Sequence, residues 1–132
     1  MTQEDKELLI KDLCARLPYN VMCEVIDSDE NLGTRVFPLF PHHITYLRDH
    51  RFLSEDKDSH WKSFKPFLRP MSSMTEEEKN YVYNHFGWTY DEGYSNLQIE
   101  GWDYLYSIHI DVHELIPKEL ALEAPEGMYK TE

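Results

Sequence analysis

The chain has 132 residues, which suits a single domain and is long enough to bury a hydrophobic core. Hydrophobic residues make up 41% and aromatic residues 14% of it, a composition too apolar for a disordered chain. The formal net charge is −12, and residues 71–132, with 13 acidic and 3 basic residues, carry −10 of it, so we expect no binding to nucleic acid or to an anionic membrane.

The N-terminus and the cysteines predict a protein of the cytoplasm. The opening stretch "MTQEDKELL" is acidic and lacks the apolar segment of a signal peptide, and no apolar run is long enough to span a membrane. Cys14 and Cys23 are too few for a disulfide scaffold and form no CxxC pair. We therefore expect two reduced and buried thiols, with Cys14 on the apolar face of the first helix.

A helix is predicted over residues 3–16. Thr2 can cap its N-terminus, with Asp5 three residues further on, which is close to a capping box. Pro18 ends it, because proline disfavours the helical conformation of the residue before it. An apolar stripe follows from leucines spaced four residues apart, namely Leu9, Leu13 and Leu17.

Strands are predicted next. "NVMCEVI" (20–26) and "TRVFPLF" (34–40) flank an acidic turn that closes with Gly33, and together they predict a hairpin. Pro38 has no N–H to donate, so the second strand ends there or lies at an edge. "HITYLRD" and "HRFL", which together span 43–53, predict one or two more short strands, and "HWKSFKPFLRP" (60–70) another.

A second helix is predicted over 76–86. Thr75 and Glu78 form a T-x-x-E capping box, glutamates fill the first turn, and Gly87 suits the left-handed position after the last turn. The stretch 100–113 fits both a strand and a helix, because its apolar residues satisfy both spacings. The last residues predict a short helical turn and a tail.

These elements predict one α+β domain over residues 1–132. It consists of an N-terminal helix, a small antiparallel sheet of three to five strands, and two further short helices. The sheet is expected to be either open or curled into an SH3-like barrel.

Three blocks resemble a group of small uncharacterised proteins from Bacteroides-type gut bacteria, their phages and their mobile elements. They are "KDLCARLPYNV" (11–21), "FKPFLRPMSSMTEEE" (64–78) and "HIDVHELIPKELALEAPEGMY" (109–129). The resemblance implies a bacterial or phage cytoplasm and no particular mechanism. It also implies that "WDYLYSIH" is helical and that a turn starting with Asp111 follows. The position of His113 is commonly a basic residue in this group, which argues against a shared metal site.

The stretch "SIHIDVHE" holds the candidate metal ligands His109, Asp111 and His113. On a strand the three would share one face and could supply two imidazoles and one carboxylate to iron or zinc. On a helix end, Asp111 would instead accept backbone N–H groups, and His109 would close the helix where positive charge is favoured. A second grouping of histidines is predicted from His42, His43, His50 and His60.

No catalytic set is evident in the sequence. It has no GxSxG, no histidine beside either cysteine and no glycine-rich phosphate loop, so we expect no cofactor and favour a protein without enzymatic activity. Bases do alternate with aromatic residues over 46–69, as on a single-strand nucleic-acid surface, but the acidic second half opposes that function. We expect a protein-interaction module that binds a protein partner. The alternative is a metal-binding protein or metal-dependent enzyme that uses the histidines and Asp111.

Overall fold

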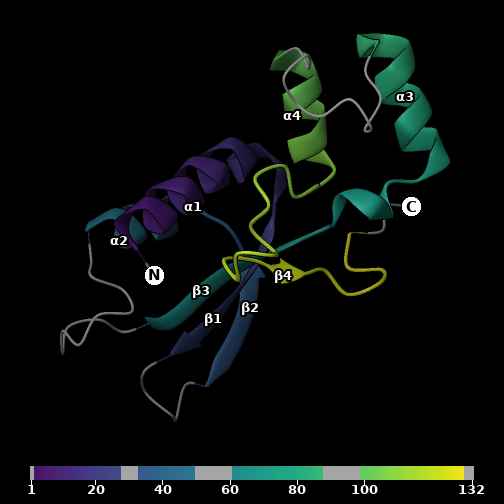
Figure 1. Ribbon diagram of the computed structural model, residues 1–132. Coiled ribbons are helices and arrows are strands. Elements are labelled where there is room, and N and C mark those ends of the chain that lie inside the picture. The colour runs from purple at the N-terminus through teal and green to yellow at the C-terminus, as the bar shows by residue number, and fades with distance from the viewer. Residues whose placement is uncertain (1, 28–32, 50–60, 88–98, 130–132) are drawn as a thin grey trace.

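The computed structural model describes residues 2–27, 33–49, 61–87 and 99–129 (Figure 1). The helices are α1 (Gln3–Arg16), α2 (Pro41–Asp49), α3 (Glu76–Phe86) and α4 (Ile99–Ser107), with short 3-10 turns at Leu17–Tyr19 and Met71–Ser73. The strands are β1 (Met22–Asp27), β2 (Thr34–Pro38), β3 (Trp61–Leu68) and β4 (Leu122–Glu123). This confirms the predicted α+β class.

The first helix begins and ends where its sequence signals predicted. The Thr2 hydroxyl accepts the N–H of Asp5 at 3.0 Å, and the Asp5 carboxylate accepts the N–H of Thr2, which completes a capping box. Leu9 and Leu13 are fully buried and hold α1 against the sheet.

The sheet has the strand order β2-β1-β3-β4. β1 pairs antiparallel with both β2 and β3, as predicted for the hairpin, but β4 pairs parallel with β3. The predictions of a wholly antiparallel sheet and of an SH3-like barrel were therefore wrong, because the sheet is mixed and open. The cause is the long connection between β3 and β4, which contains α3 and α4. Such a connection returns the chain to the end of the sheet where β3 began, so β4 runs in the same direction as β3.

One face of the sheet carries the main core. Figure 1 shows α1 and α2 on the same side of the strands. Leu13 from α1 and Leu47 from α2 are buried with Val25 and Phe64 of the central strands. On the opposite face Ile26 is 37% and Val36 is 49% exposed, so the sheet buries one face and leaves part of the other open.

The prediction of strands over 43–49 was wrong, because this stretch forms α2. Pro41 stands at the first position of that helix, where its fixed φ is favourable and its missing N–H costs nothing. His43 and Leu47 are buried whereas Thr45 between them is exposed, so the stretch follows a helical rather than an alternating pattern. "HRFL" (50–53) lies outside the described residues.

The other two helices lie side by side in Figure 1. α3 has the predicted Thr75–Glu78 capping box and ends at Gly87, whose φ is 64°. α4 settles the ambiguity of 100–113 in favour of a helix that ends at Ser107. A second core cluster joins Val82 of α3 to Leu105 of α4. No helix in the described ranges is long and apolar enough to cross a bilayer.

The two cysteines differ in exposure, contrary to the expectation that both are buried. Cys23 is buried in β1, whereas Cys14 is exposed because it lies beside the leucine stripe of α1 rather than on it. Burial also raises the pKa of the Cys23 thiol. We therefore expect one thiol to react rapidly with Ellman's reagent in the folded protein and the second only in guanidinium chloride. Replacing Cys14 by serine should abolish the rapid phase, and a rapid phase that persists would contradict this assignment.

Candidate functional site

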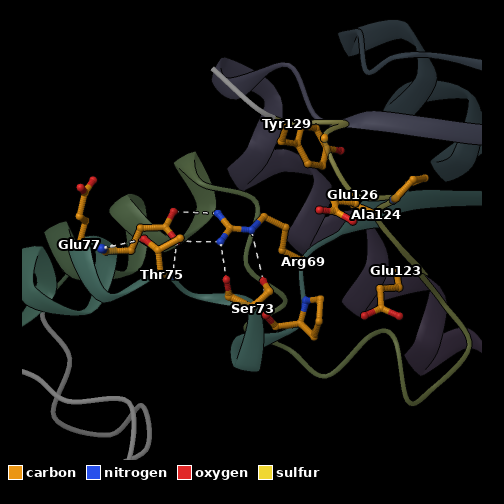
Figure 2. A pocket seen from close by; sticks show the side chains of 12 residues that line it. Arg69, Ser73, Thr75, Glu77, Glu123, Ala124, Glu126 and Tyr129 are labelled. Carbon is orange, nitrogen blue, oxygen red and sulfur yellow. Dashed lines mark hydrogen bonds and ion pairs between the residues drawn. The ribbon is translucent and has the colours of Figure 1, made fainter. Parts of the chain in front are cut away.

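A groove of about 1120 Å³ lies between two segments that are far apart in the sequence. Residues 69–78, from the end of β3 to the first turn of α3, form one wall, and residues 123–129 form the other. Figure 2 shows Arg69 between these walls, with Thr75 and Glu77 on one side and Glu123 and Glu126 on the other.

Among the described residues Arg69 is the only cationic side chain that lines the groove, and Glu78 neutralises it. The two guanidinium nitrogens donate to the two Glu78 oxygens at 2.7 and 2.8 Å, and Arg69 also binds the carbonyl of Ser73 at 2.9 Å. Burial alone would raise the pKa of Glu78, but the hydrogen bonds from Arg69 and Thr75 outweigh it and lower that pKa. The same ion pair raises the pKa of Arg69, so the pair is charged at neutral pH.

The other carboxylates of the groove face solvent. Glu77, Glu123 and Glu126 are exposed, and the structure shows no hydrogen bond or ion pair between them and another described residue. The lining thus holds four carboxylates and one guanidinium, which leaves a formal charge of −3. These four carboxylates belong to residues 71–132, so part of the acidic excess of the second half of the chain is gathered in this groove.

Tyr129 fixes the C-terminal wall to the sheet. Its hydroxyl donates to the carbonyl of Phe67 at 2.6 Å and accepts the N–H of Met22 at 2.9 Å. Burial is the main cause that raises the pKa of Tyr129 to about 12, so the hydroxyl keeps the proton that it donates. Its ring stacks on His109, with ring centroids 3.8 Å apart. The wall therefore stays in place because a half-buried aromatic side chain holds its end.

His109 lies behind this wall and has a left-handed backbone, with φ of 67°. Its carbonyl accepts the N–H of Arg69 at 2.7 Å, and its ring is buried. Burial, with Arg16 and Arg69 nearby, lowers the pKa of His109 to about 4. The expectation that His109 supplies positive charge to the helix end was therefore wrong, because the ring is neutral above about pH 4.

Asp111 caps a turn, as the second interpretation of this stretch predicted. One carboxylate oxygen accepts the N–H of Leu115 at 2.8 Å, and the other accepts the N–H of Ile116 at 2.9 Å. Both oxygens are thus occupied by backbone donors in a buried position.

His113 joins a buried charged group that the sequence analysis missed. Its Nδ1 lies 2.8 Å from Asp12, whose carboxylate also accepts two bonds from Arg16 at 2.5 and 3.1 Å. Because a carboxylate can only accept, His113 carries the proton at Nδ1. The spacing of four between Asp12 and Arg16 was a visible signal of an ion pair. Nothing in the sequence indicated that His113, about a hundred residues later, completes it.

The predicted metal ligands thus serve three separate purposes. His109 stacks on Tyr129, Asp111 caps a turn and His113 binds Asp12. In the described part of the chain, no group of three or more histidine, cysteine, aspartate or glutamate side chains is placed to hold a metal. The metal hypothesis therefore gains no support from this geometry.

The second predicted histidine grouping is described only in part. The rings of His42 and His43 on α2 lie next to each other, with centroids 4.1 Å apart and planes tilted by 53°. Burial, with His42 beside it, lowers the pKa of His43 to about 4. His50 and His60 lie outside the described residues.

Comparisons with protein-family models, with curated proteins and with solved structures found no match to this chain. The groove and its charges are therefore the basis for assigning a function.

Proposed function

We propose that the protein is a non-enzymatic protein-interaction module whose groove binds an extended, basic segment of a protein partner. One observation carries this proposal: the groove between residues 69–78 and 123–129 has three solvent-facing carboxylates and a single cation that is already paired. Such a surface attracts lysine and arginine side chains and repels acidic ones, so it selects the partner by charge.

The apolar parts of the groove suit the same ligand. Pro70, Ala124, Pro125 and Tyr129 contribute surface between the carboxylates. Lysine and arginine can lie with their aliphatic stems on such surface while their charged ends reach the acids. Each exposed ion pair contributes only up to about 1 kcal/mol, so we expect reversible and salt-sensitive binding.

The hydroxyl groups of the groove favour binding over catalysis. Ser73 donates to the carbonyl of Pro70 at 2.7 Å, Thr75 accepts the N–H of Glu78 at 3.1 Å, and Tyr129 binds the backbone of the sheet. Among the described residues no histidine lines the groove, and each of these hydroxyls is already bonded to a backbone group. A bacterial or phage cytoplasm as the setting rests on the sequence resemblance alone.

Charge reversal in the groove tests the proposal. The probe is a fluorescent ten-residue peptide that alternates lysine with alanine, and a peptide with glutamate in place of lysine is its control. We expect fluorescence anisotropy to show binding of the lysine peptide at low salt. The double substitution Glu123→Lys with Glu126→Lys should weaken it roughly tenfold, as the loss of two exposed ion pairs predicts.

The matched control is Glu4→Lys with Glu7→Lys on the exposed side of α1, which changes the net charge equally. With both double variants compared at about 0.1 M salt, this control should weaken binding by no more than about twofold, because charges more than about 10 Å apart are largely screened there. Equal losses in the two double variants would show that the peptide responds to net charge alone, and the groove would then be rejected as the site.

A further inference from the structure

In the described part of the chain no strand pairs with the outer edge of β2, and the register with β1 shows which backbone groups point outward there. β2 is the terminal strand of the sheet. The N–H of Leu39 donates to the carbonyl of Val21, and β2 continues from there in antiparallel register with β1. Because hydrogen-bonded pairs alternate along such a ladder, Arg35 and Phe37 direct their backbone groups to β1. Thr34, Val36 and Pro38 therefore direct theirs outward.

β2 has no acidic residue of its own, although Glu24 of β1 is the register partner of Val36. Val36 is 49% exposed, and Ile26 on the adjacent strand is 37% exposed. Arg35 is the only charged residue of β2. Residues 1–70 hold 12 acidic and 10 basic residues, whereas residues 71–132 hold 13 and 3. Two copies of this acidic chain would thus repel each other less through the first half of the chain, to which β2 belongs, than through the second half.

We propose that a second copy of this chain pairs with β2 in antiparallel fashion, across a twofold axis at Val36. The two Val36 residues exchange their N–H and carbonyl groups, and the N–H of each Thr34 binds the carbonyl of the opposite Pro38. These contacts give four hydrogen bonds, two between the Val36 residues and one from each Thr34. Pro38 has no N–H, so it cannot donate a bond back to Thr34. The two sheets become one, and both Val36 side chains lie together on the open face.

The side chains of β2 select this register over its neighbour. A shift that centred the axis on Arg35 would also allow hydrogen bonds, but it would place the two Arg35 side chains directly opposite each other. Like charges in that position are destabilising. In the proposed register Arg35 stands opposite Phe37 of the other copy, where a cation can lie over an aromatic ring. Because the twofold axis uses the same edge of both copies, this contact closes the assembly as a dimer.

Site-directed cross-linking tests the dimer and its register. In a Cys14→Ser background, Val36→Cys should form a disulfide-linked dimer under mild oxidation, because residues at the axis have Cα atoms about 5.5 Å apart. Thr34→Cys is the matched control on the same strand. Its two copies would lie four residues apart along the strands, roughly 13 Å, which is beyond disulfide reach. We expect most of the Val36→Cys protein and little of the Thr34→Cys protein to cross-link.

Light scattering after size exclusion supplies an independent result. The unmodified chain should have twice the monomer mass at tens of micromolar, and Val36→Lys, which places two ammonium groups together, should be monomeric with an unchanged circular dichroism spectrum. A monomeric mass for the unmodified chain would overturn the proposal. Equal cross-linking of Val36→Cys and Thr34→Cys would overturn it too, because it would show random collision. Neither result depends on the acidic groove.

Discussion

Replacing Asp12 with alanine is expected to destabilise the protein by roughly 3–5 kcal/mol, which is the usual cost of leaving a buried charge without its partner. Arg16 is fully buried, and Asp12 accepts two of its hydrogen bonds. Burial alone would raise the pKa of Asp12, but hydrogen bonds from His113 and Arg16 outweigh it and lower that pKa. Asp12 is therefore ionised at neutral pH, and its loss would leave a guanidinium inside the protein. Urea unfolding followed by circular dichroism measures the change.

Two further variants define the origin of this loss. Asp103→Ala removes a comparable hydrogen bond, 2.6 Å from the Tyr19 hydroxyl, but at an exposed site, so it should cost at most about 1 kcal/mol. Replacing Asp12 by leucine together with Arg16 by methionine removes both charges and should recover much of the stability. If Asp12→Ala cost no more than Asp103→Ala, the buried pair would not be a major determinant of stability.

Sequence reasoning succeeded where the signals are local. The capping boxes at Thr2 and Thr75 each involve residues three positions apart, so both helices could be placed nearly to the residue. The hairpin of β1 and β2 is likewise formed by neighbouring segments. In these cases the hydrogen bonds that define the element are made within a few residues of each other.

The errors arose where distant segments decide the structure. The two residues of β4 become a strand only because β3 lies beside them, and no pattern of two residues could predict that. The groove has the same origin, since Arg69 and Glu123 both line it although they are more than fifty residues apart in the chain. Acidic composition indicated an acidic surface but could not indicate which carboxylates share a groove.

The stretch from His109 to His113 could be predicted only in part, because it combines local and distant contacts. Asp111 was recognised as a cap from its residue type, and its two bonds to the following backbone are local. The partners of the two histidines were not predictable, because Tyr129 is twenty residues from His109 and Asp12 lies near the other end of the chain. A spacing that suggests a metal triad on an extended strand thus gives three unrelated contacts once α4 ends at Ser107.

Two buried histidines make stability depend on pH in a predictable direction. The pKa of both His43 and His109 is lowered from 6.5 to about 4, chiefly by burial. Below about pH 6.5 the unfolded chain binds protons at these rings while the folded protein does not, so acid favours unfolding. Stability should be fully present above pH 6.5 and fall as the pH approaches 4. We expect a loss of roughly 2 kcal/mol for each ring, since a full pKa unit corresponds to about 1.4 kcal/mol and some solvent contact persists.

Unfolding curves at a series of pH values measure the slope of the free energy of unfolding against pH. Single variants then show which histidine causes that slope. Arg69 and Tyr129 contact His109, and their raised pKa values keep both protonated in this interval, so neither contributes to the change in stability there. His109→Asn keeps a side chain that tolerates the left-handed backbone, and it should reduce the slope by about half even if it lowers stability throughout. His85→Asn, at an exposed position on α3, is the matched control and should leave the slope unchanged. A slope that survived the replacement of both buried histidines would mean that other groups cause the acid sensitivity.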